Sequence, residues 1–369
     1  MVSRDLIVVV NPGSTSTKVA LFGKNGPVLQ ETVAHDRDLV AASRVVYEQY
    51  GWRMKTVLKI LEKFEGWQTR ARAVVGRGGL LHPLPGGTYL VNDEMVEDLK
   101  VSRYGDHPSN LGAPLAKGLA DKLGVPAFIV DSVMTDELWD IARISGYAEI
   151  KRVSTTHALN IKASARRRAE LLNKPIENTN FVVCHLGGGI SVVSLKGGKI
   201  VDMNNALLGE GPFSPERVGT LPVRQLIDLC FSGKFASADA LKHKLVKEGG
   251  LYSYLKTNDL QKVEQMIADG DKEADLIFSA IFDVSTFSIA EGSFFVSTST
   301  RATIIRRSST PTPPRRKRSF FRFFLSSSCG VCGVSSEESE VSPPSPSSSM
   351  MTSSSAMGHL RGRASEPRV

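Results

Sequence analysis

The 369-residue sequence predicts a duplicated α/β fold, in which two similar domains with mixed sheets face a shared cleft and a tail follows. Three observations predict it. A strand–loop–strand–turn–strand pattern occurs twice, helical segments alternate with short strands after each copy, and the composition changes abruptly near residue 285. We expect a first domain over residues 1–150, an incomplete second domain over 151–284, and a disordered Ser-, Arg- and Pro-rich tail over 285–369.

Each copy of the repeat has the pattern of an antiparallel meander. A Gly-bearing loop joins its first two strands, and a Gly-containing turn joins the second strand to the third, which is typical of two consecutive hairpins. The predicted strands are 6–10, 19–22 and 28–33 in the first copy, and 181–184, 190–195 and 200–202 in the second.

Helical periodicity follows each meander, and the apolar runs 73–75 and 127–130 are the strands expected between the helices of the first half. The predicted helices are 38–50, 52–64, 110–123 and 134–144 in the first half, 156–172 between the halves, and 221–231, 238–246, 260–268 and 272–282 in the second. We expect His35 and His82 on the surface.

Most of the formal net charge of +8 belongs to the tail. Residues after 284 include 11 Lys+Arg against 5 Asp+Glu, which leaves 35 basic against 33 acidic residues before them. A nearly neutral folded part argues against nucleic acid as a partner. No run of about 18 apolar residues predicts a membrane span, and the N-terminal apolar run is too short for a signal peptide, so we expect a cytoplasmic protein.

The first loop of each meander is a candidate phosphate site. In the first loop a glycine allows close backbone approach, and hydroxyls and a lysine supply donors; in the second, three glycines leave N–H groups free for an anion. Either loop alone could be an ordinary hairpin turn, but at equivalent places in a duplicated fold they favour a clamped nucleotide phosphate chain. The candidate residues are Asn11, Gly13, Ser14, Thr15, Ser16 and Lys18, and His185, Gly187, Gly188 and Gly189.

These loops resemble the two phosphate motifs of the acetate and butyrate kinases, and the segment 213–222 resembles the one that carries an essential arginine of that family. Pro12, the run 77–81 and the run 105–112 are closer to the butyrate branch. The resemblance covers residues 6 to about 282. It implies a ribonuclease H-like, actin-like ATPase fold and the phosphorylation of a short-chain carboxylate, butyrate or a branched analogue, with ATP and Mg²⁺ as cofactors.

The resemblance also implies roles for single residues. Arg77 would hold the substrate carboxylate, and Arg217 would act on the transferred phosphoryl group, which His157 would also contact. His107 would lie near the substrate, and Asp131 would orient the phosphoryl site or the Mg²⁺ shell. Without the resemblance, the arginines would be read as surface residues and the histidines as structural ones.

The chemistry implied needs positive charge more than it needs a base. A carboxylate is ionised at pH 7, so no group has to remove a proton from it. The difficulty is to bring this anion onto the γ-phosphate of another anion, and catalysis then consists of positioning and charge stabilisation. Arginines suit both tasks because their planar fork grips carboxylate and phosphate oxygens in pairs.

The sequence departs from the family pattern after about residue 283. Family members continue with a further strand, a Gly-Gly loop that grips adenosine and more helices, whereas this chain has no Gly-Gly pair after Gly250. A reading-frame change in the encoding DNA or an unrelated tail would explain this. The chain is therefore either a carboxylate kinase or a catalytically impaired remnant that acts at most as a ligand binder. A homodimer or higher homo-oligomer stays open.

Overall fold

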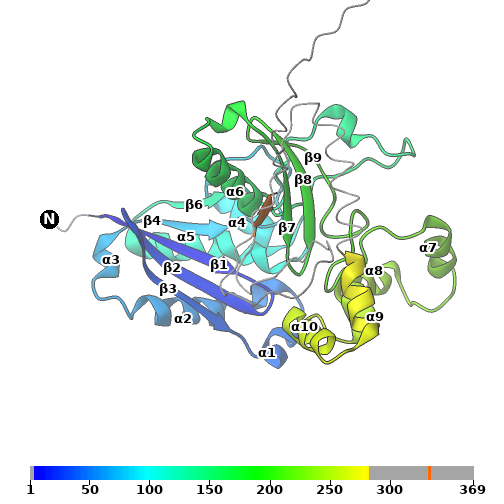
Figure 1. Cartoon of the computed structure of the whole chain (residues 1–369). Helices are drawn as coiled ribbons and strands as arrows, with labels where there is room; N and C mark the ends of the chain where they lie inside the picture. The colour runs from blue at the N-terminus through cyan, green and yellow to red at the C-terminus, as the bar shows by residue number, and fades with distance from the viewer. Residues whose placement is uncertain (1–3, 282–330, 334–369) are drawn as a thin grey trace, which may run out of the picture. The chain divides into compact units, whose positions relative to one another are not determined.

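The computed structural model describes residues 4–281 and 331–333, which contain two β-sheets with helices packed against them (Figure 1). The strand order is β3-β2-β1-β4-β6-β5 in the first sheet and β10-β7-β8-β9 in the second. The disorder expected over 285–369 concerns residues that lie outside the described part, except for 331–333.

The first sheet begins with the predicted meander. Strands β1 (Leu6–Pro12), β2 (Ser16–Gly23) and β3 (Gly26–Ala34) pair in antiparallel fashion. On its other side β1 runs parallel to β4 (Ala71–Arg77), and β4 runs parallel to β6 (Ala127–Val130), which also pairs with the short antiparallel β5 (Thr88–Leu90). The sheet is therefore mixed, and its parallel strands end together at one edge.

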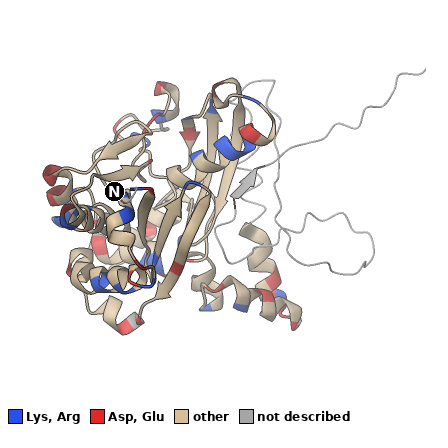
Figure 2. Ribbon diagram, turned by 90° about the vertical axis from the view of Figure 1, so that its left-hand side faces the viewer, with Lys and Arg blue, Asp and Glu red and all other residues tan. Residues whose placement is uncertain are grey.

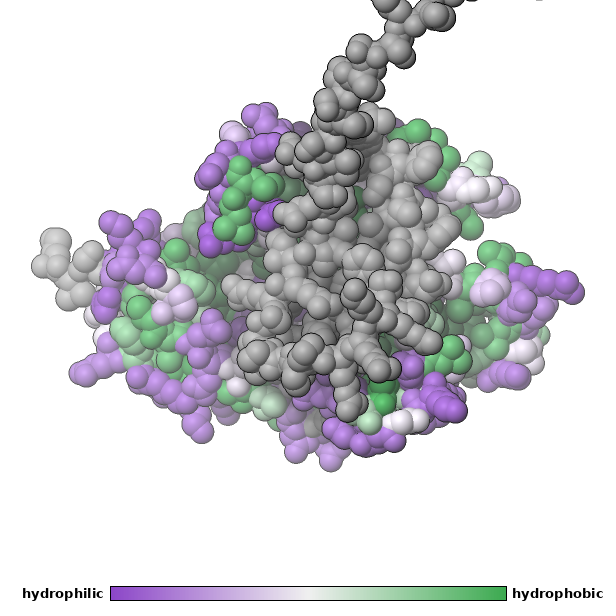
Figure 3. Space-filling view, viewed as in Figure 1, coloured by the Kyte–Doolittle hydropathy of each residue, from purple (hydrophilic) through white to green (hydrophobic). Residues whose placement is uncertain are grey.

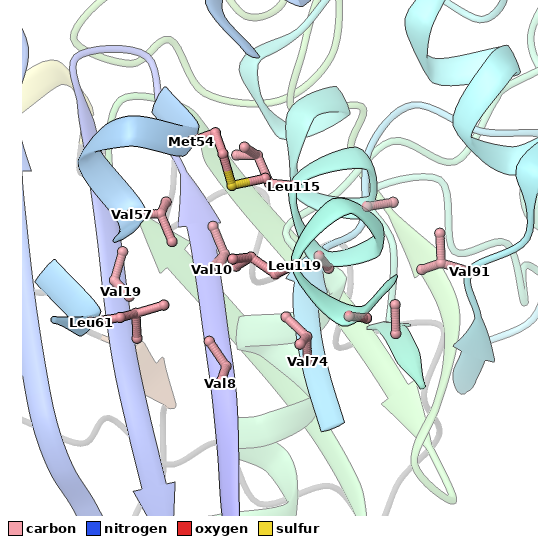
Figure 4. Packing of buried hydrophobic residues seen from close by; sticks show 14 of the residues in the cluster. Val8, Val10, Val19, Met54, Val57, Leu61, Val74, Val91, Leu115 and Leu119 are labelled. Atoms are coloured by element: carbon pink, nitrogen blue, oxygen red, sulfur yellow. The ribbon is translucent and has the colours of Figure 1, made fainter. Parts of the chain in front are cut away.

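Two helices cover one face of this sheet. Leu6, Val8 and Val10 alternate along β1 and have no exposed surface, because α2 (Tyr50–Leu61) and α5 (Gly112–Leu123) pack over them. Figure 4 shows side chains of both helices, such as Leu61 and Leu115, that approach the side chains of β1, β2 and β4. This apolar layer fixes the strand ends that carry the candidate site.

The second sheet contains the other meander, formed by β7 (Asn180–Leu186), β8 (Ile190–Lys196) and β9 (Lys199–Met203). Both of its faces are covered. Phe181 and Val183 pack with α6 (Ala158–Leu171), whereas Val182 and Cys184 pack in a second cluster that includes residues of α9 (Gly250–Leu255) and α10 (Leu260–Ala268).

One short strand lies on the free side of β7. Strand β10 (Val331–Gly333) pairs antiparallel with residues 183–185 of β7. The structure therefore differs from the expected disorder at these three residues. The reason is that the edge of β7 away from β8 has backbone donors and acceptors, and another segment of the chain can form hydrogen bonds with them.

The remaining helices are short, and charges of both signs are interspersed along the ribbon (Figure 2). Figure 3 shows hydrophobic residues beside hydrophilic ones at its right-hand margin, where α7 lies in Figure 1 and where Val223 and Ile227 are exposed. Among the described residues, no helix has the length and apolar character to span a membrane. These helices are α1 (Arg37–Ala41), η1 (Val46–Gln49), α3 (Trp67–Arg70), α4 (Asp93–Lys100), η2 (Pro108–Leu111), η3 (Asp140–Arg143), η4 (Ile176–Asn178), α7 (Val223–Cys230), α8 (Ala238–Lys247) and a helix over 272–281.

Three predicted elements are wrong in part. The helix expected over 38–50 is divided into α1 and η1, because the Arg44 N–H donates to the Glu48 side chain and the Val46 N–H to the Asp106 side chain instead of to helical carbonyls. The helix expected over 134–144 is reduced to η3, because Thr135 forms a β-bridge with Leu84 and the Asp136 N–H donates to the Leu84 carbonyl. The polar loop expected over 11–18 is shorter, because Asn11 pairs with Lys18 and the strands continue into it. Only the turn 13–15 remains outside the strands.

Candidate active site

Arg77 and Asp131 lie at the same edge of the first sheet. Arg77 is the last residue of β4 and pairs with Val130, the last residue of β6, so Asp131 follows directly. Gly76 allows this edge to pack closely on α5, since a Cβ there would lie 2.1 Å from the Gly112 carbonyl oxygen. The carboxyl ends of parallel strands are where α/β proteins commonly bind ligands.

Arg217 comes from the loop before α7, which is tied to the second glycine loop. The Ser214 hydroxyl donates to the Gly188 carbonyl at 2.7 Å and accepts from the Arg217 N–H at 3.1 Å. The Arg217 Nη1 donates to the Ala206 carbonyl at 2.6 Å and packs against Gly189, where a Cβ would lie only 2.3 Å from it. The glycine loop therefore leaves room for this guanidinium.

Three histidines lie around the two arginines. The rings of His157 and His185 stack, with centroids 3.9 Å apart and an interplanar angle of 15°. His157 Nδ1 lies 2.8 Å from the Ser191 hydroxyl, and His107 Nδ1 accepts the Ser109 N–H at 3.2 Å. Because its Nδ1 is an acceptor, the neutral ring of His107 carries its proton on Nε2.

The predicted residues of both halves line one cavity. It encloses about 360 Å³, including the part that is open to solvent. Sequence reasoning placed Arg77, His107, His157 and Arg217 here, and the structure brings all four together. It did not identify the apolar and hydroxyl-bearing residues that complete the lining. Their only signal in the sequence is that they lie close to these four residues. The added lining residues are Leu80, Val133, Thr155, Thr156, Ala206 and Leu207.

The electrostatics of the cavity favour an anion. Burial lowers the pKa of Arg217; the charge of Glu216 opposes this shift in part, and the charge of Arg77 adds to it. No carboxylate lies within ion-pair distance of Arg217 in the described ranges 4–281 and 331–333. The buried atoms Arg217 Nε, His185 Nδ1 and Thr156 Oγ1 also have no hydrogen-bond partner in this part of the chain. Such groups indicate a polar ligand.

Burial also keeps the histidines neutral. It lowers the pKa of His107 to about 3 and that of His185 to about 4, and the charges of Arg77 and Arg217 act in the same direction. The pKa of His157 lies well below its usual value, first because of burial and then because of His185 and the arginines. At pH 7 the arginines therefore supply the charge, and the histidines supply hydrogen bonds.

The two predicted phosphate loops are placed differently. Gly187 and Gly189 form a turn between β7 and β8 that adjoins Arg217, and Gly187 also lines an apolar hollow of about 270 Å³ with Leu260 and Phe278. The first loop is not among the described lining of the main cavity. Ser14 and Thr15 are exposed in its turn, while Asn11, Gly13, Ser16 and Lys18 are half-buried around it.

Asp131 does not by itself fit a magnesium site. Its Oδ1 accepts the Gly87 N–H at 2.9 Å and its Oδ2 pairs with Arg166 at 3.1 Å, so protein groups use both oxygens. The described residues hold no cluster of three or more metal-ligating side chains. Its φ of 41° is rare for a non-glycine residue and is held by these partners. The role in the Mg²⁺ shell stays a prediction.

The neutral histidines predict that stability falls in mild acid. Unfolded histidine titrates near pH 6.5, so below that pH the unfolded chain binds protons that the folded chain does not bind. The free energy of unfolding should drop as pH falls from 7 to 5, by about 1–2 kcal/mol for each of His107 and His185, and His157 should act in the same direction. Urea unfolding at both pH values measures this. His107→Asn should show a smaller drop, and an unchanged free energy in the parent chain would contradict the assignment.

The contact between Gly189 and Arg217 can be tested with a neighbouring glycine as the control. Gly189→Ala places a methyl group against the guanidinium and should lower the free energy of unfolding by about 1–3 kcal/mol. Gly188→Ala meets nothing within 4 Å and should change it by less than about 0.5 kcal/mol. Equal effects in urea unfolding would mean that Arg217 does not depend on this contact.

Comparison with known proteins agrees with this architecture. Residues 148–289 match the sequence model of the acetokinase family. The structure resembles acetate kinase from Porphyromonas gingivalis with TM-score 0.63 and 17% identity, over 79% of this chain and 80% of that one. For a propionate kinase from Francisella tularensis subsp. tularensis SCHU S4 the values are 0.61, 17%, 79% and 80%, and for acetate kinase from Entamoeba histolytica 0.58, 14%, 78% and 78%. The chain thus has the α/β actin-like ATPase fold of these kinases, which confirms the predicted fold class.

Proposed function

We propose that this chain phosphorylates a short-chain carboxylate with ATP to give the acyl phosphate and ADP. One observation carries the proposal: Arg77 from the first half and Arg217 from the second line one cavity, and in the described part of the chain no carboxylate lies within ion-pair distance of Arg217. Two guanidinium groups that raise each other's electrostatic energy are stabilised when an anion enters between them. The match of residues 148–289 to the acetokinase family supports the same reaction.

The proposed transfer is in line. A carboxylate oxygen attacks the γ-phosphorus, a new P–O bond forms, and the bond to the ADP oxygen breaks. No proton moves, because the carboxylate is already ionised. Arg77 holds the carboxylate, and Arg217 faces the charge that develops on the phosphoryl oxygens. The neutral rings of His107 and His157 orient these oxygens by hydrogen bonds and add no charge.

The cavity wall supports a chain longer than acetate. Leu80, Val133 and Leu207 line it beside the arginines. Each methylene group that leaves water adds about 0.8 kcal/mol to binding. A four-carbon or branched substrate gains more from such a wall than acetate does. We therefore propose butyrate or a branched analogue as the acceptor.

The substrate assignment predicts an order of activity. The full chain is incubated with ATP, Mg²⁺ and carboxylates of two to five carbons, and hydroxylamine traps the acyl phosphate. We expect a higher kcat/KM for butyrate than for acetate, by about tenfold or more for two extra buried methylene groups. A preference for acetate, or for a sugar hydroxyl, would contradict the proposal.

Two variants separate the roles of the arginines in the same assay. Arg217→Ala removes an interaction with transition-state charge and should lower kcat by about 10³-fold or more. Arg77→Ala should mainly raise KM for the carboxylate. Near-normal turnover by Arg217→Ala would refute its role, and an unchanged KM in Arg77→Ala would refute the other.

A second candidate function is a ligand-binding remnant without turnover. The observation that favours it is the difference between the sheets. On the side away from β2, strand β1 pairs in parallel with β4 over five residues, whereas the equivalent β7 has, on the side away from β8 and among the described residues, only the three-residue antiparallel β10. Among the described residues, the second half therefore has no counterparts of β4 and β6. The adenosine of ATP would be bound in this part of the second half.

This candidate predicts weak nucleotide binding. A nucleotide held only by its phosphates loses the burial of adenine and ribose, at about 25 cal/mol per Å² of apolar surface. Isothermal titration with ATP and Mg²⁺ should then give a Kd well above the micromolar range, and no acyl phosphate should form. Micromolar affinity would instead mean that an adenosine site exists, for example in the apolar hollow beside Gly187.

A further inference from the structure

A buried arginine lies behind the turn of the first hairpin. Arg53, on α2, has no exposed surface. Its Nη1 donates to the Ser16 carbonyl at 3.0 Å and to the Thr17 hydroxyl at 2.8 Å, and its Nη2 donates to the Gly13 carbonyl at 2.9 Å. Its Nε donates to the Gln49 side chain at 3.0 Å. Three of the four contacts are therefore made to the hairpin.

The charge of Arg53 is not neutralised by an acid. Within residues 4–281 and 331–333, no carboxylate lies within ion-pair distance of it. Burial lowers its pKa to about 10, so it remains protonated at pH 7. Carbonyl and hydroxyl oxygens accept four hydrogen bonds from its five N–H groups, and the Trp52 ring centroid lies 4.9 Å from its Cζ, but these neutral groups leave a full positive charge behind the turn. If this position served only for packing, an apolar residue would be sufficient there.

The contacts of Arg53 also fix which groups of the turn face inward. The Gly13 and Ser16 carbonyls point to the guanidinium, and the Thr15 carbonyl accepts the His35 N–H at 2.8 Å. The Thr17 hydroxyl accepts from Arg53 and also lies within hydrogen-bond distance of His35 Nε2, 2.8 Å away. In the described structure, the N–H groups of Ser14 and Thr15 have no protein acceptor.

We propose that Arg53 is a positioning residue for an anion at the first hairpin. It holds the carbonyl groups of the turn inward, so that the Ser14 and Thr15 N–H groups stay available to phosphate oxygens, and its charge attracts the anion. This inference rests on the proposed function in one respect: the anion is then the phosphate chain of ATP. The positioning role can be measured without turnover.

The experiment uses the full chain and two readouts. Hydrogen exchange reports the amides of Gly13, Ser16 and Thr17, since those of Ser14 and Thr15 have no protein acceptor, and titration with inorganic tripolyphosphate at low and high salt reports anion binding. For Arg53→Met we expect hairpin amides to exchange about tenfold faster or more, and tripolyphosphate affinity to fall about tenfold or more with a weaker salt dependence. For Arg53→Lys, which keeps charge without a fork, affinity should recover in part and hairpin protection should not.

Val57→Ala is the matched control, since Val57 is equally buried one turn along the same helix. It should lower protection throughout the first-sheet core without a selective effect on the amides of Gly13, Ser16 and Thr17. If Arg53→Met does not fold, Gln49→Leu removes only the Nε contact and should give a smaller, still selective, increase in hairpin exchange. A folded Arg53→Met or Gln49→Leu protein with unchanged hairpin exchange overturns the positioning role.

The two proposals fail in different ways. If the parent chain does not bind tripolyphosphate but Arg53→Met selectively speeds hairpin exchange, the positioning role stands and the phosphate site of the proposed function is overturned. If the parent chain binds tripolyphosphate and Arg53→Met binds it equally well at both salt concentrations, the anion role of Arg53 is overturned and the phosphate site stands.

Discussion

The site depends on the positive charge of Arg53 and Arg217, which is held out of water and, within residues 4–281 and 331–333, has no carboxylate at ion-pair distance. Each of the two equivalent hairpins has a guanidinium against its turn: Arg53 contacts the Gly13 and Ser16 carbonyls, and Arg217 packs on Gly189. These arginines come from different parts of their halves, a helix in one and a loop in the other. The two hairpins thus both have a positive charge at the turn, but arginines from different kinds of element provide it. Phosphate chemistry needs such charge, and desolvation makes it act strongly.

A buried ion pair holds the two halves in register around this charge. Lys162 on α6 binds both oxygens of Glu137 at 2.8 Å, and these oxygens also accept the N–H groups of Gly86 and Ile200. One carboxylate therefore ties the segment before β5, the helix α6 and the strand β9. Asp131 and Arg166 make a second link between the strand edge and α6. Removing one partner of a buried pair is strongly destabilising, which keeps the cavity walls at a fixed spacing.

Sequence reasoning succeeded where periodicity and glycine decide the structure. The meanders, strand β6 and helix α10 follow from local patterns, and the four residues Arg77, His107, His157 and Arg217 line one cavity, while their roles stay predictions. It failed where distant contacts decide. The helix expected over 134–144 loses to a bridge with Leu84, which no local pattern reveals. The engagement of both Asp131 oxygens by Gly87 and Arg166 is equally invisible in sequence, because these partners lie 44 and 35 residues away.

Arg53 shows why a charged residue inside a helical period is easily missed. It stands four and eight residues before Val57 and Leu61, on the face that packs against the first sheet, and all three are fully buried. Periodicity assigns this face to the core, while residue type assigns arginine to the surface. Both cannot hold unless the charge has a polar partner within the core, and here the partner is the backbone of the hairpin. His35, expected on the surface, is half-buried for the same reason, since it completes the polar contacts of Thr17. In this chain, the register of Arg53 with core positions is the sequence signal that its guanidinium has polar partners inside the fold.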